Sequence, residues 1–408
     1  MSLHLHWYLP TSGDGRGIVS AGRTGSRGIG DDHDVVERGP DIAYLAQVAR
    51  SAEQLGFEAV LTPTGTWFED AWLTTAALSQ VTERLKFLVA FRPGLVSPTL
   101  AAQQAQTFQR LSGGRLLLNV VTGGDPVEQR RFGDRLSHDE RYDRCGEFLT
   151  VLRGASGREP FDYVGKHYDV EGATARMSEW GLPPLFFGGA STAAEDVAAE
   201  HVDVYLAWGE TPPQLKIRID RMREKAAAHG RELSFGVRLH TLGRDTSKLA
   251  WAEADRMLEA LTPERIAQAQ ADLAKTDSVG QQRMRSLHGG SHKDLEIYPT
   301  SGPATDWSGV ARGRLWSAAT NRSRSGSRSI TPWASTTPSC PVSPTWRRPT
   351  GSARAQVACY ARGESRRRWG ISNDANEQSG VLVTREPRRS LAGDPVPPRA
   401  ATALLARS

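Results

Sequence analysis

Two cationic side chains, Arg238 and His240, stand two residues apart in a short apolar segment that reads FGVRLH. Alternate residues of a β-strand point to the same face, so this spacing places the two side chains together. A guanidinium with its fixed fork of donors, beside an imidazole, can hold an anionic group. The alternative is an arginine paired with a nearby carboxylate and a histidine packed in the core. The residues alone leave both interpretations open.

A second group of residues suits a phosphate dianion. Arg141 and Tyr142 stand at the start of one expected helix, and Ser191 precedes another after a Gly-Gly pair. Backbone N–H groups at a helix start, an arginine and hydroxyl groups are donors that a phosphate requires. A Gly-Gly pair alone is common in turns, so the prediction depends on the whole group.

The elements expected to position these residues alternate between short apolar strands and longer helices. Strands are expected at residues 3–10, 57–62, 85–91, 115–121, 184–187, 202–208 and 233–239. Helices are expected at residues 41–56, 69–82, 97–111, 140–155, 192–201 and 213–229. Nearly continuous apolar runs such as LLLNVV and KFLVAF are typical of parallel strands buried on both faces.

A doubly wound sheet and a (β/α)8 barrel both fit this alternation. A doubly wound nucleotide-binding fold should show G-x-G-x-x-G after an early strand, and the sequence lacks that motif. Nearly every expected strand ends in a polar or Gly-rich loop, and a barrel gathers such loops at one mouth. We therefore expect a (β/α)8 TIM barrel, although seven repeats leave it one unit short.

The chain changes character twice beyond the seventh strand. Residues 244–299 are polar with a helical pattern, which indicates an insertion that is either a lid over the barrel mouth or a surface helical pair. From Thr300 onward lysine and histidine disappear, and Arg, Ser, Pro, Thr and Trp dominate. We expect one barrel over residues 1–299 and a disordered basic tail over residues 300–408.

The net charge of +5 is divided unevenly. Residues 301–408 hold 17 arginines, no lysine and 6 acidic residues, a net charge of +11. The remaining 34 basic and 40 acidic residues give the first 300 residues a net charge of −6. A basic surface for nucleic acid is therefore not expected on the folded body.

Location and cysteine content point to an ordinary cytoplasmic protein. The sequence has no apolar run of membrane-spanning length, and its first residues lack the pattern of a signal peptide, so we expect a cytoplasmic protein that binds no membrane. The three cysteines, Cys145, Cys340 and Cys359, are too few and too scattered for a metal site or a disulfide framework.

Several segments together resemble the alkanesulfonate monooxygenases of the bacterial-luciferase-like family. They are WYLPTSGDG (7–15), LTPTGTWFEDAW (61–72), RLKFLVAFRPGLVSP (84–98), SGGRLLLNVVTGGDP (112–126), ERY (140–142), FFGGAS (186–191), VDVYLAWGE (202–210), FGVRLH (235–240) and DSVGQQRM (277–284). They occur in the family's order over nearly all of residues 1–299, so the resemblance is specific, whereas one such segment alone would be weak.

The resemblance implies a (β/α)8 barrel that uses reduced FMN (FMNH2) as a co-substrate. A separate NAD(P)H-dependent FMN reductase supplies the FMNH2, which reacts with O2. The C–S bond of an alkanesulfonate is then cleaved to give an aldehyde and sulfite. Such enzymes are typically homo-oligomers, and no metal is implied.

The resemblance also assigns roles to residues. Arg238 and His240 can clamp the sulfonate or stabilise a flavin peroxide, and Trp208 can wall the substrate and exclude water, although a strand-end tryptophan is often only packing. These three are the expected catalytic residues, with Arg238 and Trp208 also contacting substrate. The expected flavin-binding residues are Thr62, Asn119, Thr122, Arg141, Tyr142 and Ser191.

One departure from the family pattern falls at the expected substrate site. Phe68, in GTWFEDAW, stands where the family usually has cysteine. A phenyl ring fills volume but cannot supply the weak donor of a thiol. We expect Phe68 to contact substrate and to alter affinity for substrate or flavin.

A larger departure begins at Thr300. Family members continue with Asn-Leu-Trp-Ala-Gly, which the codons AAC CTC TGG GCC GGC would encode. Translation of the same bases from the second base gives Thr-Ser-Gly-Pro, the sequence of residues 300–303. The family's Pro-His-Leu-Glu-Glu-Ala-Tyr-Arg, shifted likewise, gives Pro-Thr-Trp-Arg-Arg-Pro-Thr, as at residues 344–350. The same one-base shift thus reproduces two distant segments of this chain, which indicates a frameshift near Pro299. The alternative is a divergent functional tail.

The slip has structural and functional consequences. The eighth strand–helix unit would be lost, so the first and seventh strands would keep unpaired edges, and the chain would fold poorly and be inactive. The remaining alternatives are a monooxygenase of methanesulfonate, a sulfone or a long-chain alkane, and a non-catalytic product. The last is either a decayed paralogue or a protein that binds nucleic acid through its basic tail.

Overall fold

The computed structural model describes residues 3–14, 38–208, 210–244, 246–259, 277–286, 307–310, 315–319 and 355–361. The chain divides into two compact units, Met1–Glu364 and Ser365–Ser408, and all of the described residues belong to the first. The sequence motifs at 300–303 and 344–350 therefore lie outside the described residues.

Seven strands pair in parallel, in the order in which the chain forms them. They are β1 (Leu3–Tyr8), β2 (Ala59–Thr62), β3 (Lys86–Phe91), β4 (Leu116–Val120), β7 (Leu185–Phe187), β8 (Val204–Trp208) and β9 (Ser234–Arg244). Each of the seven strands was predicted, within a few residues at each end, except that β9 runs five residues beyond its expected end. The curled parallel sheet of a TIM barrel is therefore confirmed.

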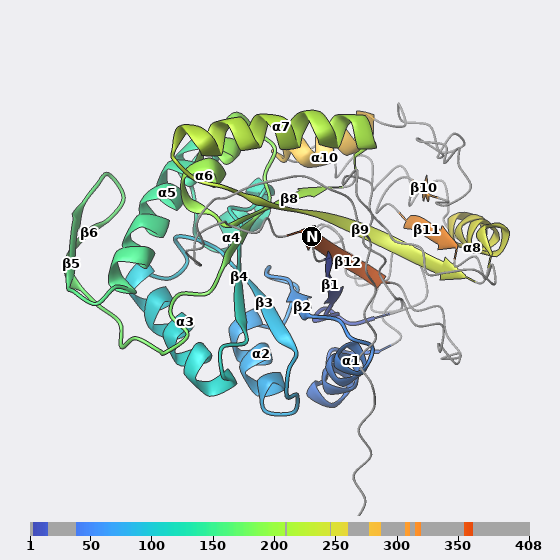
Figure 1. Cartoon of the computed structure of the whole chain (residues 1–408), viewed down its shortest axis with the longest axis horizontal. Coiled ribbons are helices and arrows are strands. Elements are labelled where there is room, and N and C mark those ends of the chain that lie inside the picture. Colours follow the sequence, from blue (N-terminus) through green and yellow to red (C-terminus); the bar gives the residue numbers. More distant parts are fainter. Residues whose placement is uncertain are drawn as a thin grey trace, which may run out of the picture. The chain divides into compact units, whose positions relative to one another are not determined.

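Helices follow most of these strands and cover the outside of the sheet, as Figure 1 shows. They are α1 (Ile42–Gln54), α2 (Ala71–Ser79), α3 (Pro98–Ser112), α4 (Pro126–Arg131), α5 (His138–Ala155), α6 (Thr192–His201) and α7 (Pro212–Ala228). The helix starts follow from local chemistry: the side chains of Asp41, Asp70 and Ser97 each accept a hydrogen bond from a backbone N–H of the first turn. Ser137 and Glu140 form a reciprocal capping box on α5.

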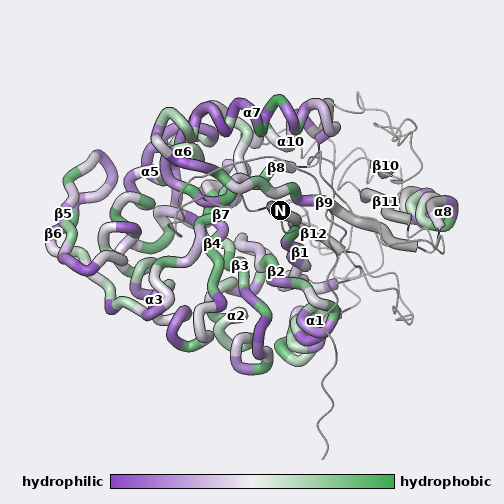
Figure 2. The backbone as a smooth tube through the Cα atoms, in the orientation of Figure 1, coloured by the Kyte–Doolittle hydropathy of each residue, from purple (hydrophilic) through white to green (hydrophobic). Residues whose placement is uncertain are grey.

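The buried apolar side chains form two layers on opposite faces of the strands. The larger layer lies between strands and helices and includes Val60, Phe87, Leu118 and Phe187. The smaller layer fills the barrel interior and consists of Ala59, Leu61, Leu88, Leu117, Phe186, Val204 and Leu206, with Tyr8 packed against it. Figure 2 shows the hydrophobic strands surrounded by helices of mixed polarity. The strict alternation between layers identifies which strand residues face inward.

The barrel ring is closed, which corrects the expectation of open edges. Strand β12 (Ala355–Ala361) pairs with β1 on one side and with β9 on the other, antiparallel to both. An exposed strand edge presents unpaired N–H and C=O groups, and AQVACYA contains residues that favour strands. A (β/α)8 barrel needs a parallel eighth strand, so β12 occupies the closing position in the wrong direction.

Two more strands, which the sequence did not predict, lie in the described part of the tail. Strand β10 (Trp307–Val310) pairs with β11 (Leu315–Ala319), and β11 continues in parallel along the end of β9. The insertion contains α8 (Ser247–Glu259) and α10 (Val279–Ser286), in agreement with its helical pattern. The sequence did not predict α4 or the hairpin of β5 (Phe161–Val164) and β6 (Asp169–Ala173).

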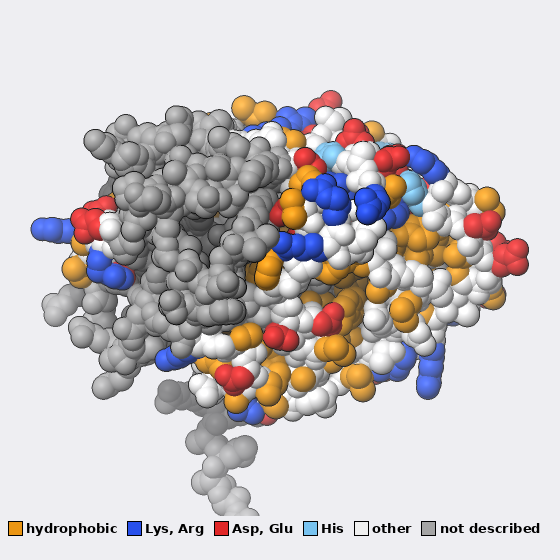
Figure 3. Space-filling model, turned by 180° about the vertical axis from the view of Figure 1, so that it is seen from behind, with side chains coloured by type: hydrophobic (Ala, Val, Ile, Leu, Met, Phe, Trp, Pro, Cys, Tyr) orange, Lys and Arg blue, Asp and Glu red, His pale blue; other side chains and the backbone are white. Residues whose placement is uncertain are grey.

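In the part of the chain that the structure describes, no helix has the length and apolar character required to cross a membrane. Figure 3 shows one face of the molecule, where basic side chains gather next to acidic and histidine side chains over the described residues.

Candidate functional site

The predicted site residues gather where the parallel strands end. Asn119 is the penultimate residue of β4, Trp208 ends β8, and Arg238 lies on β9 directly across from Trp208. The carboxyl ends of barrel strands form the mouth that holds active sites in this architecture. The backbones of these residues therefore share one end of the barrel, while their catalytic and flavin-binding roles stay predictions.

The inner mouth is built around the guanidinium of Arg238. Its Cζ atom lies 5.0 Å from the ring centroid of Trp208 and 5.9 Å from that of Tyr8. A cation over the faces of two aromatic rings is held in place by the attraction between its charge and the rings. Trp208 and Arg238 lie on the adjacent strands β8 and β9, and closure of the ring brings Tyr8 of β1 to them.

The protonation states of this group suit anion binding. Burial lowers the pKa of Arg238, and the nearby Tyr8 raises it, yet a guanidinium stays charged at neutral pH. Burial raises the pKa of Tyr8 to about 12, while Arg238 opposes that shift. Tyr8 is therefore a neutral phenol, and Arg238 brings a positive charge to a largely apolar interior.

A second group consists of three hydroxyls. Tyr142, near the start of α5, is hydrogen-bonded to the side chains of Thr122 and Ser191. Ser191 also caps α6, because its Oγ accepts a hydrogen bond from Ala194 N at 3.2 Å. Burial raises the pKa of Tyr142, so the phenol keeps its proton. Residues from three separate elements thus meet here, while their flavin-binding roles stay predictions.

Arg141 is a buried cation next to this group. Its side chain is 3% exposed, and its Nη1 donates to Leu136 O at 2.9 Å. Among the described residues, Nε and Nη2 make no hydrogen bond, and Nη2 lies 3.5 Å from Oδ2 of Asp277 in an ion pair. A buried guanidinium with spare donors is costly unless an anion completes its shell.

Residues present here fit a phosphate group. The spare donors of Arg141, the hydroxyls of Tyr142 and Ser191 and the start of α6 supply the charge and hydrogen bonds that a phosphate dianion requires. The Gly-Gly turn before Ser191 has a simpler explanation: a Cβ on Gly189 would lie 2.5 Å from that of Ala194. Its glycine therefore serves close packing of the turn against α6.

A buried ion pair holds three of the mouth loops together. Arg92 Nη2 donates to Glu128 Oε2 at 2.5 Å, and Glu128 Oε1 accepts from Thr66 N at 3.1 Å. The neighbouring Gln129 donates from Nε2 to Thr122 O at 2.6 Å. The loops after β2, β3 and β4 are thus tied to one another, and Thr122 is held by its backbone.

Phe68 belongs to the first of these loops. Its backbone N–H donates to Gly65 O at 3.2 Å, and its ring lies close to the position that a Cβ on Gly65 would take. The side chain is partly buried. Its contact with substrate stays a prediction.

The strand end that carries Trp208 is anchored from outside the barrel. Two residues later, Glu210 Oε1 accepts from Arg218 Nη2 of α7 at 2.5 Å. Arg218 Nη1 also lies 3.7 Å from Glu195 Oε1 of α6. These buried charges fix the chain direction after Trp208.

Three predicted residues have different outcomes. Asn119 alternates with Leu117 onto the inner face, between Ala90 and Phe186 of the adjacent strands, as its assignment requires. Thr62 alternates with Leu61 onto the helix-facing side, so its pattern does not favour a flavin contact. His240 lies on β9, but its side chain is outside the described residues, and its role stays a prediction.

Sequence reasoning missed the groups that support the site. Tyr8 lies in WYLPTSGDG, and only closure of the barrel shows that it stacks on Arg238. Arg92 and Glu128 are 36 residues apart, and their types alone are common surface residues. Among the described residues, no cluster of three or more His, Cys, Asp or Glu side chains could hold a metal ion.

Comparison with known protein families gives one match. The family described as "Luciferase-like monooxygenase" matches residues 17–307, which is well over half of the chain. The match includes Arg141, Tyr142, Trp208 and Arg238 but not Tyr8, and it ends close to the change in composition at Thr300. Such monooxygenases use a reduced flavin and O2.

Solved structures share this fold at low sequence identity. EDTA monooxygenase (EmoA) from Chelativorans sp. BNC1 has a TM-score of 0.59 and 18% identity, over 73% of this chain and 80% of that one. DmoA from Hyphomicrobium sulfonivorans has a TM-score of 0.55 and 20% identity, over 67% of each chain. The long-chain alkane monooxygenase LadA has a TM-score of 0.52 and 20% identity, over 64% of this chain and 69% of its own.

Proposed function

Because the chain belongs to the luciferase-like monooxygenase family, we propose that its barrel is that of an FMNH2- and O2-dependent alkanesulfonate monooxygenase. The overall reaction converts an alkanesulfonate, O2 and FMNH2 into an aldehyde, sulfite, FMN and water. One oxygen atom enters the aldehyde and the other enters water, and FMNH2 supplies the two electrons. A separate NAD(P)H-dependent FMN reductase delivers FMNH2, and the working enzyme is a homo-oligomer.

The observation that carries this proposal is the cation of Arg238 above an apolar barrel interior. Leu61, Leu88, Leu117, Phe186 and Leu206 line the inner layer, and Arg238 is held against Trp208 and Tyr8 at its mouth. A sulfonate is a permanent anion with three acceptor oxygens, and its alkyl chain is apolar. The interior thus offers a matching environment to each part of the substrate.

Each residue group has a separate task in the reaction. When bound, the reduced flavin supplies the electrons and the site at which O2 is activated. Arg141, Tyr142 and Ser191 bind its phosphate, and Asn119 lies where a polar side chain can reach the ring edge. Arg238 orients the sulfonate and stabilises the negative charge that sulfite carries away from the carbon. Trp208 and Tyr8 exclude water around that guanidinium.

A long-chain alkane monooxygenase is the main alternative within the fold, since the interior is apolar and LadA shares the architecture. An uncharged alkane, however, forms no ion pair with a guanidinium at the mouth, whereas a sulfonate does. Methanesulfonate and sulfones would use Arg238 but leave much of the apolar interior empty. These considerations favour an alkanesulfonate with an extended chain.

We also propose that the residues from Thr300 onward are read in a shifted frame. The direction of β12 supports this, because a strand that evolved to close the ring would run parallel to β1 and β9. The end of the family match at residue 307 supports it too. The chain as written then lacks the family's eighth strand–helix unit and oxidises no sulfonate.

The test uses the chain with its reading frame restored, supplied with FMNH2, O2 and a series of alkanesulfonates. We expect sulfite release that increases with chain length beyond methanesulfonate, and loss of at least about 100-fold in Arg238→Gln, since one charged transition-state contact contributes roughly that much. Oxidation of an alkane without sulfite release from any sulfonate would overturn the proposal. Intact upstream reading of the gene across codons 298–301 would overturn the frame shift alone.

A further inference from the structure

The segment 277–286, here called the strap, crosses the barrel mouth and touches both groups of site residues. The backbone N–H of Asp277 donates to Gly124 O at 3.1 Å. A Cβ added to Gly124 would lie 3.0 Å from the Cβ of Ser278, and a Cβ added to Gly280 would lie 3.3 Å from Cδ1 of Trp208. The strap therefore lies in close contact with the loop after β4 and with the indole that ends β8.

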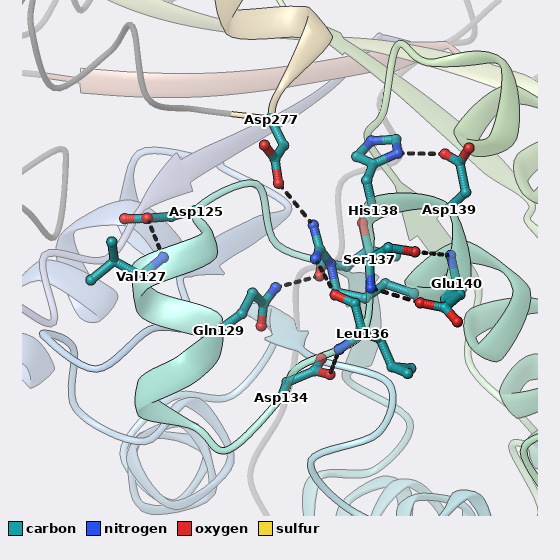
Figure 4. Close-up of polar contacts among 12 residues, drawn as sticks. Asp125, Val127, Gln129, Asp134, Leu136, Ser137, His138, Asp139, Glu140 and Asp277 are labelled. Carbon is teal, nitrogen blue, oxygen red and sulfur yellow. Dashed lines mark hydrogen bonds and ion pairs between the residues drawn. The ribbon is translucent and has the colours of Figure 1, made fainter.

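The acidic residue at the start of the strap, Asp277, is directed at Arg141, the buried arginine of the proposed phosphate site. Figure 4 shows Asp277 approaching the residues around Gln129, Leu136 and Ser137 from the strap. Its Oδ2 is the anion nearest to Arg141 that the structure describes, at 3.5 Å from Nη2. That distance is an ion pair but too long for a good hydrogen bond, so the carboxylate only partly satisfies the guanidinium.

A carboxylate and a phosphate cannot both occupy this position. The spare Nε and Nη2 donors of Arg141 fit two oxygens of a phosphate, which forms stronger, shorter hydrogen bonds to a guanidinium. A phosphate dianion there would also repel the carboxylate of Asp277, whose side chain is 37% exposed and therefore has solvent to turn toward.

We propose that the Asp277 carboxylate occupies the phosphate position beside Arg141 while no flavin is bound. The phosphate of the incoming flavin displaces this carboxylate and so releases the strap from the mouth. The proposal rests on the proposed flavin-dependent function, and it adds that strap position and flavin binding are coupled. Linkage requires the coupling to be reciprocal: the Asp277 carboxylate weakens binding of a flavin that carries phosphate, and such a flavin weakens the contact of the strap. A flavin without phosphate leaves the strap in place.

The experiment compares FMN, riboflavin and inorganic phosphate on the full chain and on Asp277→Asn, which keeps the side-chain shape but removes the charge. We expect the Kd for FMN to fall at least about fivefold in Asp277→Asn, the lower range of typical coupling between sites. The Kd for riboflavin should stay unchanged, and inorganic phosphate should compete with FMN more effectively in the variant. Asp255→Asn, an exposed acid on α8 of the same insertion, is the matched control and should change neither Kd.

Hydrogen exchange of the strap gives a second readout. FMN and inorganic phosphate should accelerate exchange of the Asp277 amide, whose hydrogen bond to Gly124 O would open, whereas riboflavin should not. Weaker FMN binding in Asp277→Asn would show that Asp277 instead positions Arg141, and slower exchange with FMN would show that the strap closes over the flavin; either result overturns the proposal. Absence of FMN binding in both proteins would overturn the phosphate site and the proposed role of Asp277 with it, whereas the sulfonate test on the frame-restored chain decides the proposed function separately.

Discussion

Replacing Glu128 by Gln is expected to destabilise the barrel strongly, because it removes the counter-charge of a buried arginine. The side chains of Arg92 and Glu128 are only 5% and 10% exposed, and their atoms Nη2 and Oε2 are 2.5 Å apart. Gln keeps the shape and can still accept from Thr66 N, so the loss is chiefly that of the charge. Breaking a buried ion pair from one side costs about 3–5 kcal/mol.

We place the expected loss near the lower end of that range, at about 3 kcal/mol, because the amide oxygen of Gln can still accept one hydrogen bond from Arg92. The assay is equilibrium unfolding by denaturant, followed by circular dichroism, with the free energy taken from the midpoint and slope. The matched control is Asp220→Asn, whose partner is Lys216 in an ion pair with side chains that are 65% and 47% exposed. The control should lose little or no stability, because an exposed ion pair is screened by solvent.

The two variants together make the reasoning refutable. If Glu128→Gln loses no more stability than Asp220→Asn, the Arg92–Glu128 pair does not hold the mouth loops, and the account of how Thr122 is positioned is wrong. A large loss should also be accompanied by weaker FMN binding, because Gln129, adjacent to Glu128, holds the backbone oxygen of Thr122.

Three further predictions follow from separate parts of the molecule. In a fluorescence titration, Tyr142→Phe should raise the Kd for FMN by roughly tenfold and leave the Kd for riboflavin unchanged, because a hydrogen bond to a charged group contributes about 1.5 kcal/mol. Equal weakening of FMN and riboflavin binding would place the phenol away from the phosphate. Val357→Pro should lower the midpoint of unfolding by denaturant, because proline removes a backbone donor from β12 between β1 and β9. An unchanged midpoint would mean that β12 does not close the ring. Burial lowers the pKa of His6 below its usual 6.5, so near that pH the folded state binds fewer protons than the unfolded state. The free energy of unfolding should therefore fall as pH drops from about 7.5 to about 5.5. His6→Phe should reduce that fall in midpoints measured at the two pH values, and an equal fall would assign the acid sensitivity elsewhere.

The sequence predicted the barrel because parallel strands buried on both faces leave a strong signal. Runs such as LLLNVV became β4, with Leu117 and Asn119 facing inward and Leu118 facing the helices. Helix starts were also readable, since a capping residue such as Ser97 acts within its own first turn. The hairpin of β5 and β6 was missed because its strands are short and largely exposed.

Part of the site was accessible from sequence and part was not. The sequence grouped Tyr142 and Ser191 from their places at helix starts, which a barrel brings together, but it named Thr122 only as a flavin-binding residue and did not predict its hydrogen bond to Tyr142. Tyr8 and Glu128 could not be predicted, because their roles arise from contacts between distant segments. The short strands of the tail were not predicted for a related reason: composition reports average tendencies, whereas an open strand edge can pair with a short segment such as AQVACYA.

The most direct test of the central claim follows the two atoms of O2. The frame-restored chain is given FMNH2, isotopically labelled O2 and octanesulfonate, and the aldehyde is trapped at once by reduction to the alcohol. The account predicts one labelled oxygen in the trapped alcohol and sulfite that carries only the three oxygens of the substrate. Label in the sulfur product, or an oxygenated product whose C–S bond is intact, would contradict it.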